Sequence, residues 1–165
     1  MPRYQHRRML TAHFPSGYIA GHLLARRGEP IVLGAAILGA VFPDIDMLWF
    51  VFVDGGIVHH HAYPTHWPLF WIALGLLTTL AAARYPRSGR AILALCAGAL
   101  LHTVLDTIAA PIYWLMPFDN TAFELMAVPA RYEHWIVSFL LHWTFALELT
   151  IWALAAMTYV QTVRK

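Results

Sequence analysis

Acidic and imidazole side chains interrupt the apolar stretches of this chain at spacings that suit metal binding. His102 and Asp106 are four residues apart, which on a helix puts both side chains on one face, about a turn apart. Asp44 and Asp46 follow Pro43, which makes a helix irregular and lets two carboxylates converge. Ionisable groups in apolar surroundings cost several kcal/mol each unless they have partners. The spacing therefore predicts a functional site, and a metal ion is the simplest partner.

A second signal is the histidine loop, residues 59–66, which holds four histidines in eight residues. Imidazole is the commonest neutral metal ligand and suits zinc, iron, nickel and copper. We favour His61 and His66 as ligands over the other two, because Pro64 supplies the turn that their five-residue spacing needs. The loop also fits a second interpretation, a wet interfacial segment with Trp67 in an aromatic belt.

The other signals have structural interpretations as well. A His-xxx-Asp pair such as His102 and Asp106 is often a hydrogen-bonded structural contact, and Pro43 could simply kink a helix whose next turn is capped by aspartate. His142 and Glu148, in the last apolar stretch, could orient ligand imidazoles. For Glu148 we favour pairing with a backbone or tyrosine group.

Composition predicts a membrane protein. Hydrophobic residues make up 59% of the chain and charged residues 12%, whereas a soluble domain usually carries about 25% charged residues. Four apolar stretches approach or exceed the roughly 17–25 residues that cross a bilayer. They cover residues 31–53, 67–83, 91–116 and 135–160. We predict an all-α fold in one domain over residues 1–165, a polytopic transmembrane bundle of about four membrane-spanning helices plus a short N-terminal helix.

Basic residues predict the orientation, because lysine and arginine are retained on the cytoplasmic side. With both termini cytoplasmic, ten of the eleven basic residues fall inside and only Arg131 lies outside. The chain would then be a multi-pass protein of the cell membrane with the histidine loop on its outer face. We expect no cleavable signal peptide, because Pro15, Ser16 and His22 interrupt the first apolar stretch.

Depth in the bilayer brings the candidate ligands to one level. At a helical rise of about 1.5 Å per residue, Asp44 and His102 both lie roughly 16–20 Å above the inner surface, near the midplane. His13 reaches that level if residues 14–25 form a half-helix. The segment before His13 holds three arginines and must either re-enter from the inner side or begin outside. The sequence leaves both routes open.

Two other classes of inference find no support in the sequence. Cys96 is the single cysteine, so the chain offers no disulfide and its redox compartment cannot be inferred. The net charge of +2 is small and the arginines are dispersed, so we expect no nucleic-acid partner. The oligomeric state is left open.

The order of the motifs is more specific than any one of them. They are His-xxx-Gly at His13, Phe-Pro-Asp-Ile-Asp at residues 42–46, the histidine loop with Thr65 and His66, His-xxx-Asp at His102, and Pro-Ile-Tyr-Trp-Leu-Met-Pro at residues 111–117. Over about residues 11–118 this order resembles the YdjM-like family of bacterial membrane-bound metal-dependent hydrolases. The resemblance implies a bacterial inner-membrane location and a metal site made of His13, Asp44, Asp46, His61, His66, His102 and Asp106.

A more distant resemblance concerns chemistry. The YdjM-like family looks similar to the all-helical zinc phospholipase C and single-strand nuclease group, in which several zinc ions cleave phosphoesters. This implies one to three divalent ions, with zinc first among metals. The chain departs from the family pattern at three places: Ala62 stands where arginine is usual, Pro64 precedes Thr65, and Trp67 replaces serine. The missing arginine removes a phosphate clamp, so substrate or activity could differ.

Taken together, the motifs and the resemblance predict a hydrolase of phosphoesters or lipid-like esters that uses metal-activated water. An aspartate not fully used in coordination, Asp46 or Asp106, would take the proton of that water. The partners expected are membrane lipids, with an amphiphilic substrate. Two alternatives stay open: a metal transporter or sensor without covalent chemistry, and a structural protein whose metal locks helices together. The chain shows no inverted repeat such as transporters often have.

Overall fold

The structure is a computed structural model that describes residues 11–164 except 56, 58, 127–128 and 130. Within the described residues the regular elements are helices, and the β-structure is an isolated bridge between Ile112 and Phe123. The prediction of an all-α fold is therefore confirmed.

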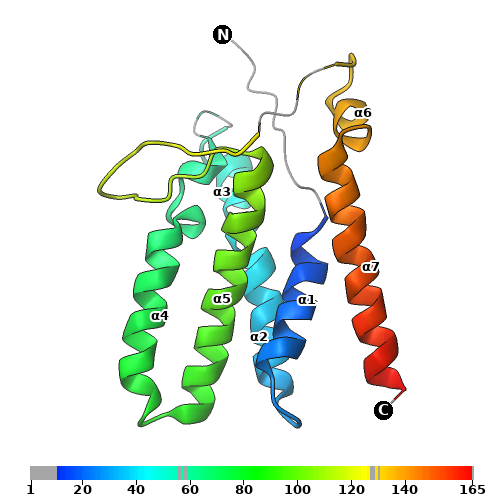
Figure 1. The fold of residues 1–165 in the computed structure, drawn as a ribbon. Helices are drawn as coiled ribbons and strands as arrows, with labels where there is room; N and C mark the ends of the chain where they lie inside the picture. The colour runs from blue at the N-terminus through cyan, green and yellow to red at the C-terminus, as the bar shows by residue number, and fades with distance from the viewer. Residues whose placement is uncertain (1–10, 56, 58, 127–128, 130, 165) are drawn as a thin grey trace.

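The α-helices form a bundle, and short 3-10 turns interrupt its chain (Figure 1). The elements are α1 (His13–Leu24), α2 (Pro30–Val41), η1 (Phe42–Ile45), α3 (Asp46–Phe52), η2 (His60–Ala62), η3 (Pro64–His66), α4 (Pro68–Ala82), α5 (Pro86–Ala109), α6 (Trp135–Leu140) and α7 (Trp143–Val163). Three of the helices begin with proline, at Pro30, Pro68 and Pro86. Proline suits the first helical turn, where its missing N–H has no partner to lose.

Three segments are long and apolar enough to cross a membrane: Pro30–Phe52, Pro86–Ala109 and Trp143–Val163. The helix Pro68–Ala82 is apolar but shorter, and α1 is the short N-terminal helix that was expected. The third apolar stretch stops being helical at Ala109, because Pro111 favours an extended residue before it. The last stretch divides at Leu141, and the His142 side chain caps the new helix by accepting from Thr144 N–H.

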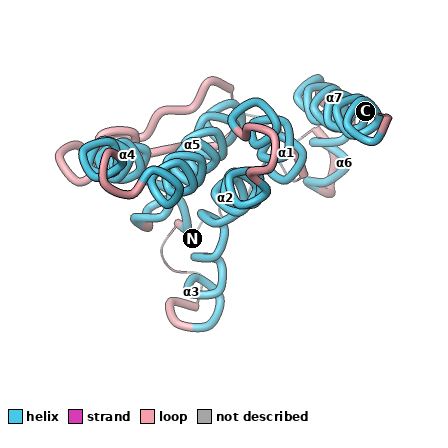
Figure 2. The backbone as a smooth tube through the Cα atoms, turned by 90° about the horizontal axis from the view of Figure 1, so that it is seen from below, coloured by secondary structure: helices cyan, strands magenta, loops and turns pink. Residues whose placement is uncertain are grey.

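The helix α5 is the centre of the bundle, with α2 and α4 packed against it and α1 packed on both α2 and α5 (Figure 2). The crossing of α2 and α5 is close because glycines meet backbone there. A Cβ on Gly39 would collide with the carbonyl of Leu95, and a Cβ on Gly98 would collide with the carbonyl of Ala36. Small residues allow such close packing between membrane helices. The outlying helix α7 lies beside α1.

One end of the bundle is strongly basic. The α1–α2 connection, the α4–α5 connection and the end of α7 all lie there (Figure 1). We call it the arginine end, and it carries Arg26, Arg27, Arg84, Arg87, Arg90 and Arg164. The remaining arginine of the described residues, Arg131, belongs to the long connection between α5 and α6. Six of the ten basic residues predicted to lie on one side thus share one end of the molecule, while Arg3, Arg7, Arg8 and Lys165 lie outside the described residues.

Candidate metal centre

The candidate ligands come from element ends that meet away from the arginine end. His13 is the first residue of α1, Asp44 lies in η1, and His61 and His66 lie in η2 and η3. Pro43 begins the 3-10 turn that separates α2 from α3, which is the irregularity that the sequence predicted. These side chains meet the last turns of α5, which supply two more candidate ligands.

Those two are His102 and Asp106, which share one face of α5 as the four-residue spacing predicted. His102 lies sixteen residues after the first residue of α5, so it is about 24 Å from the arginine end. His102 therefore lies farther from the inner end of its helix than the sequence predicted, because the helix begins at Pro86 rather than at residue 91. The centre thus lies nearer the end of α5 than its middle.

Asp106 is the residue on which the imidazoles converge. Its Oδ1 lies 3.2 Å from Nε2 of His13. Its Oδ2 lies 3.2 Å from Nε2 of His102, 3.5 Å from Nε2 of His61 and 3.7 Å from Nε2 of His66. Every one of these five side chains is buried, so a single carboxylate is surrounded by four imidazoles out of contact with water.

Asp44 borders the centre on another side. Its Oδ1 lies 3.8 Å from Nε2 of both His66 and His102. The Asp44 side chain is 43% exposed, whereas those of His66 and His102 are fully buried. The centre is therefore reachable from the side where Asp44 lies.

In three of the rings, the nitrogen that faces away from the centre, Nδ1, forms a hydrogen bond. This bond decides which of the two ring nitrogens carries the proton. Nδ1 of His61 lies 3.0 Å from the Pro111 carbonyl, and Nδ1 of His102 lies 2.8 Å from the Ala40 carbonyl. Nδ1 of His66 lies 2.6 Å from an Asp46 carboxylate oxygen. A carbonyl or carboxylate oxygen only accepts, so each Nδ1 carries the proton and each Nε2 of a neutral ring presents a lone pair to the centre.

Burial keeps the rings of His61 and His66 neutral. Removal from water lowers the pKa of His61 to about 2 and that of His66 to about 3, although the Asp106 carboxylate acts in the opposite direction. Neutral imidazole is the form that binds metal ions. At pH 7 both Nε2 atoms are thus available as ligands.

Neutral rings in these orientations leave acceptor atoms facing one another. Nε2 of His66 and Nε2 of His102 are 3.2 Å apart, and both face oxygens of Asp44 and Asp106. Converging lone pairs and carboxylates repel each other unless a proton or a metal cation lies among them. The residues therefore fit a divalent ion through their donor set, which mixes imidazole nitrogen with carboxylate oxygen.

The ligand atoms fall into groups that each lie within 4.8 Å. Three groups share members and form one centre: His13, His102 and Asp106; Asp44, His66 and His102; and His61, His66 and Asp106. Six of the seven residues predicted from the sequence are thus brought together by the fold. The geometry is compatible with a metal site, while the identity of the metal stays a prediction.

Comparison with known proteins agrees with the order of the motifs. The family model described as YdjM inner membrane protein matches residues 9–165. The chain belongs to the YdjM family. No curated protein and no solved structure was found to match it. The family's description and the long apolar helices together locate this YdjM protein in the membrane. The more distant likeness to the zinc phospholipase C and nuclease group stays a prediction.

The seventh predicted ligand of this YdjM protein, Asp46, has a different position. Its Oδ2 accepts hydrogen bonds of 2.6 Å from the Thr65 hydroxyl and from Nδ1 of His66. It belongs to none of the ligand groups found among the described residues. Asp46 therefore contacts the far side of a candidate ligand, where its carboxylate fixes the ring orientation and makes Nε2 of His66 more basic.

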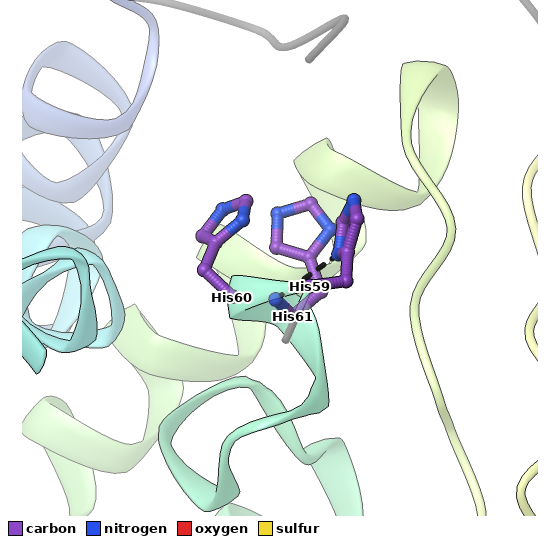
Figure 3. A group of neighbouring side chains, drawn as sticks. All are labelled: His59, His60 and His61. Atoms are coloured by element: carbon purple, nitrogen blue, oxygen red, sulfur yellow. Dashed lines mark hydrogen bonds between the residues drawn. The ribbon is translucent and has the colours of Figure 1, made fainter. Parts of the chain in front are cut away.

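The histidine loop contributes a fourth group, His59, His60 and His61 (Figure 3). The three rings lie next to one another, and Nδ1 of His59 accepts a hydrogen bond from the His61 backbone N–H. His60 also packs edge-on against Phe50. His61 connects this group to Asp106, which agrees with the preference for His61 over its two neighbours.

Glu148 holds the chain just before His13. It is fully buried, and its Oε2 accepts from the backbone N–H of Thr11 at 3.1 Å and from the Thr11 hydroxyl at 2.7 Å. Trp152 of α7 donates to the same hydroxyl at 3.1 Å. The preference for a backbone partner is confirmed, and the contact ties α7 to the residues just before α1.

Some contributors to the centre were not found from the sequence. The carbonyls of Ala40 and Pro111 fix two of the rings, but a carbonyl belongs to every residue and leaves no signal in a sequence. Thr65 did carry a signal, since it precedes His66 in the motif, and its hydroxyl binds Asp46. Among the other described histidines, His22 has a local partner, because its Nδ1 donates to the Tyr18 carbonyl.

Proposed function

We propose that this YdjM protein is a multi-pass, membrane-bound, metal-dependent hydrolase that cleaves a phosphoester or lipid-like ester with one to three divalent ions, zinc first among metals. One observation carries the proposal. The Nε2 atoms of His61, His66 and His102 converge on the Asp106 carboxylate in a buried cluster. In the neutral rings of His61 and His66 these atoms carry lone pairs directed at the same point, where a cation would be bound.

Access to the centre supports catalysis over a purely structural metal. Structural zinc sites are closed by their protein ligands, whereas catalytic sites keep one position open. Here the buried ligands lie on one side and the half-exposed Asp44 on the other. A substrate would approach at Asp44, and the bound ion would lower the pKa of a water there and polarise an ester oxygen.

The roles of the chain's own residues follow from their positions. His13, His61, His66, His102 and Asp106 would hold the ion. Asp44, as the carboxylate at the accessible side, is best placed to take a proton from the attacking water. Asp46 would orient His66, since its Oδ2 is already engaged by the His66 ring and by Thr65. This moves the proton-accepting role away from Asp46.

The orientation in the membrane is part of the proposal. The arginine end would face the cytoplasm with the end of α7, and the metal centre would lie toward the outer face. In that position the centre is close to lipid headgroups of the outer leaflet. This favours an amphiphilic ester from the membrane as the substrate class.

The test is metal analysis of purified protein together with assays on a generic phosphomonoester, a phosphodiester and a phospholipid. We expect wild type to retain a divalent metal and to hydrolyse one of the three classes. His102→Ala and Asp44→Ala should each lower activity roughly 100-fold or more, and His102→Ala should also lose metal. His134→Ala, an exposed histidine outside the centre, is the control and should keep both.

Two outcomes would contradict the proposal. Well-folded wild type that retains no divalent metal under any loading condition would exclude a metal centre. Wild type that holds metal through His102 but hydrolyses none of the three substrate classes would favour a sensor or a metal-locked structural protein instead.

A further inference from the structure

A cavity at the arginine end lies far from the metal centre. It measures about 680 Å³ and is bounded by the α1–α2 connection and the end of α7. Its lining includes His22, Arg26, Arg27, Glu29, Leu33 and Thr162. Arg26 follows His13 by thirteen residues, which corresponds to about 20 Å along a helix. The cavity is therefore a separate feature.

The cavity has a net positive character. The one carboxylate in its lining, Glu29, is paired with Arg90, whose Nη2 and Nε lie 2.6 Å and 3.1 Å from its two oxygens. Glu29 also accepts from the backbone N–H of Arg26 at 2.9 Å. Its charge is thus balanced from outside the cavity, and the pairing lowers the pKa of Glu29, so it stays ionised. The exposed guanidinium groups of Arg26 and Arg27 remain to attract an anion.

A separate apolar groove lies farther along the same two helices, away from the arginine end. It measures about 260 Å³ and lies between Phe14 and Tyr18 of α1 and Trp152, Ala156 and Tyr159 of α7. Lining residues of the two hollows are neighbours on α1, because Tyr18 lines the groove and His22, one turn later, lines the cavity. Rings of these two residues are 4.3 Å apart. We call the line along which α1 faces α7 the α1–α7 seam.

The seam matches an amphiphile in both shape and location. A basic hollow lies at the arginine end, where positive residues meet the cytoplasmic surface of a membrane, and basic pockets there bind anionic headgroups. The groove that follows has an apolar lining and runs along α7, a helix apolar enough to lie in the hydrocarbon. A free phosphate would use only the first of these hollows.

We propose that the α1–α7 seam binds an anionic phospholipid of the inner leaflet, with its phosphate at Arg26 and Arg27 and an acyl chain in the groove beside Trp152 and Tyr159. The headgroup is a bundle's length from Asp106, so this lipid is bound and not hydrolysed at the metal centre. It would instead hold α7 against α1. The outlying position of α7 in the bundle gives such a lipid a role, because few other contacts secure that helix (Figure 2).

The test measures the melting temperature of purified protein in detergent after adding phosphatidylglycerol, phosphatidylcholine or inorganic phosphate. We expect phosphatidylglycerol to raise the melting temperature of wild type and the other two additives to have little effect. Arg26→Gln with Arg27→Gln should weaken phosphatidylglycerol binding roughly 25-fold, at about fivefold for each arginine. The control, Arg84→Gln with Arg87→Gln, removes the same charge from the same end outside the cavity and should respond like wild type.

A second pair of variants tests the groove. Ala156→Trp fills the groove and should weaken the response to phosphatidylglycerol, whereas Ala153→Trp, an exposed position of α7 outside the groove, should not. Equal responses of the two arginine pairs would overturn the site, because the effect would then be diffuse charge. A shift with inorganic phosphate as large as that with phosphatidylglycerol would overturn the lipid as occupant. None of these readouts depends on hydrolase activity.

Discussion

At the residue scale, the centre depends on hydrogen bonds made by Nδ1 of each imidazole, whereas Nε2 is the candidate ligand atom. Each of His61, His66 and His102 has its Nδ1 fixed by an oxygen from elsewhere in the fold. Fixing one nitrogen of an imidazole decides both the tautomer and the direction of the other nitrogen. The most sensitive of these oxygens belongs to Asp46, because it is a charged group and the others are neutral carbonyls.

The substitution Asp46→Asn tests this role. The asparagine oxygen can still accept from Nδ1 of His66, but it carries no charge, so Nε2 becomes a weaker ligand. We expect zinc affinity, measured by competition with a chelator, to fall about 10- to 100-fold while the protein stays folded. Asp119→Asn, an exposed carboxylate in the long connection, is the control and should bind zinc like wild type. An unchanged affinity in Asp46→Asn would show that Asp46 does not act on the ligand.

At the element scale, the sequence predicted the helices better than their interruptions. Long apolar stretches predict helices because length and hydropathy alone decide them in a membrane. The ends were displaced where local chemistry overrides hydropathy, as at Pro111 after α5 and His142 before α7. Pro43 predicted an irregular backbone at this point, and the structure has there the 3-10 turn that carries Asp44. The partners of the rings could not be predicted, because they depend on which helices pack together.

The crossing of α2 and α5 brings the Ala40 carbonyl to His102, and Gly39 makes this approach possible. Gly39→Ala places a methyl group against the Leu95 carbonyl, so we expect a destabilisation of about 1–3 kcal/mol and weaker zinc binding. Gly34→Ala, in the same helix, meets no atom within 4 Å and is the matched control. It should leave the melting temperature unchanged or raise it, since alanine is the better helix former. Equal melting temperatures for both variants would refute the close crossing.

The contact between α7 and α1 can be tested through Glu148. Glu148→Gln keeps an oxygen that can accept from Thr11 but removes its charge, and a hydrogen bond to a charged group is worth about 1.5–3 kcal/mol against about 0.5–1.5 kcal/mol for a neutral one. We expect a lower melting temperature and, because Thr11 is two residues from His13, a lower zinc affinity as well. Glu133→Gln, at an exposed position, is the control. A variant that melts lower but binds zinc like wild type would limit Glu148 to securing α7.

At the scale of the whole molecule, the bundle separates two kinds of chemistry. The described arginines other than Arg131 gather at one end, and the buried histidines and carboxylates lie toward the other. Each feature alone was visible in the sequence as a local pattern. Their separation by most of the length of α5 follows only from the fold. The helices α1 and α4 each run from the metal centre to the arginine end, and so bring segments that are distant in the sequence to the same two ends.

This separation predicts which residues are accessible from each side of the membrane. Cys96 is buried, so single cysteines introduced at the surface can be labelled over a low background. A membrane-impermeant maleimide should label Asp119→Cys, in the α5–α6 connection, in intact spheroplasts, because that connection leaves the bundle beyond the metal centre. It should label Arg84→Cys, at the arginine end, only after the spheroplasts are lysed. The reverse pattern would place the metal centre on the cytoplasmic side and would move its substrate to the inner leaflet.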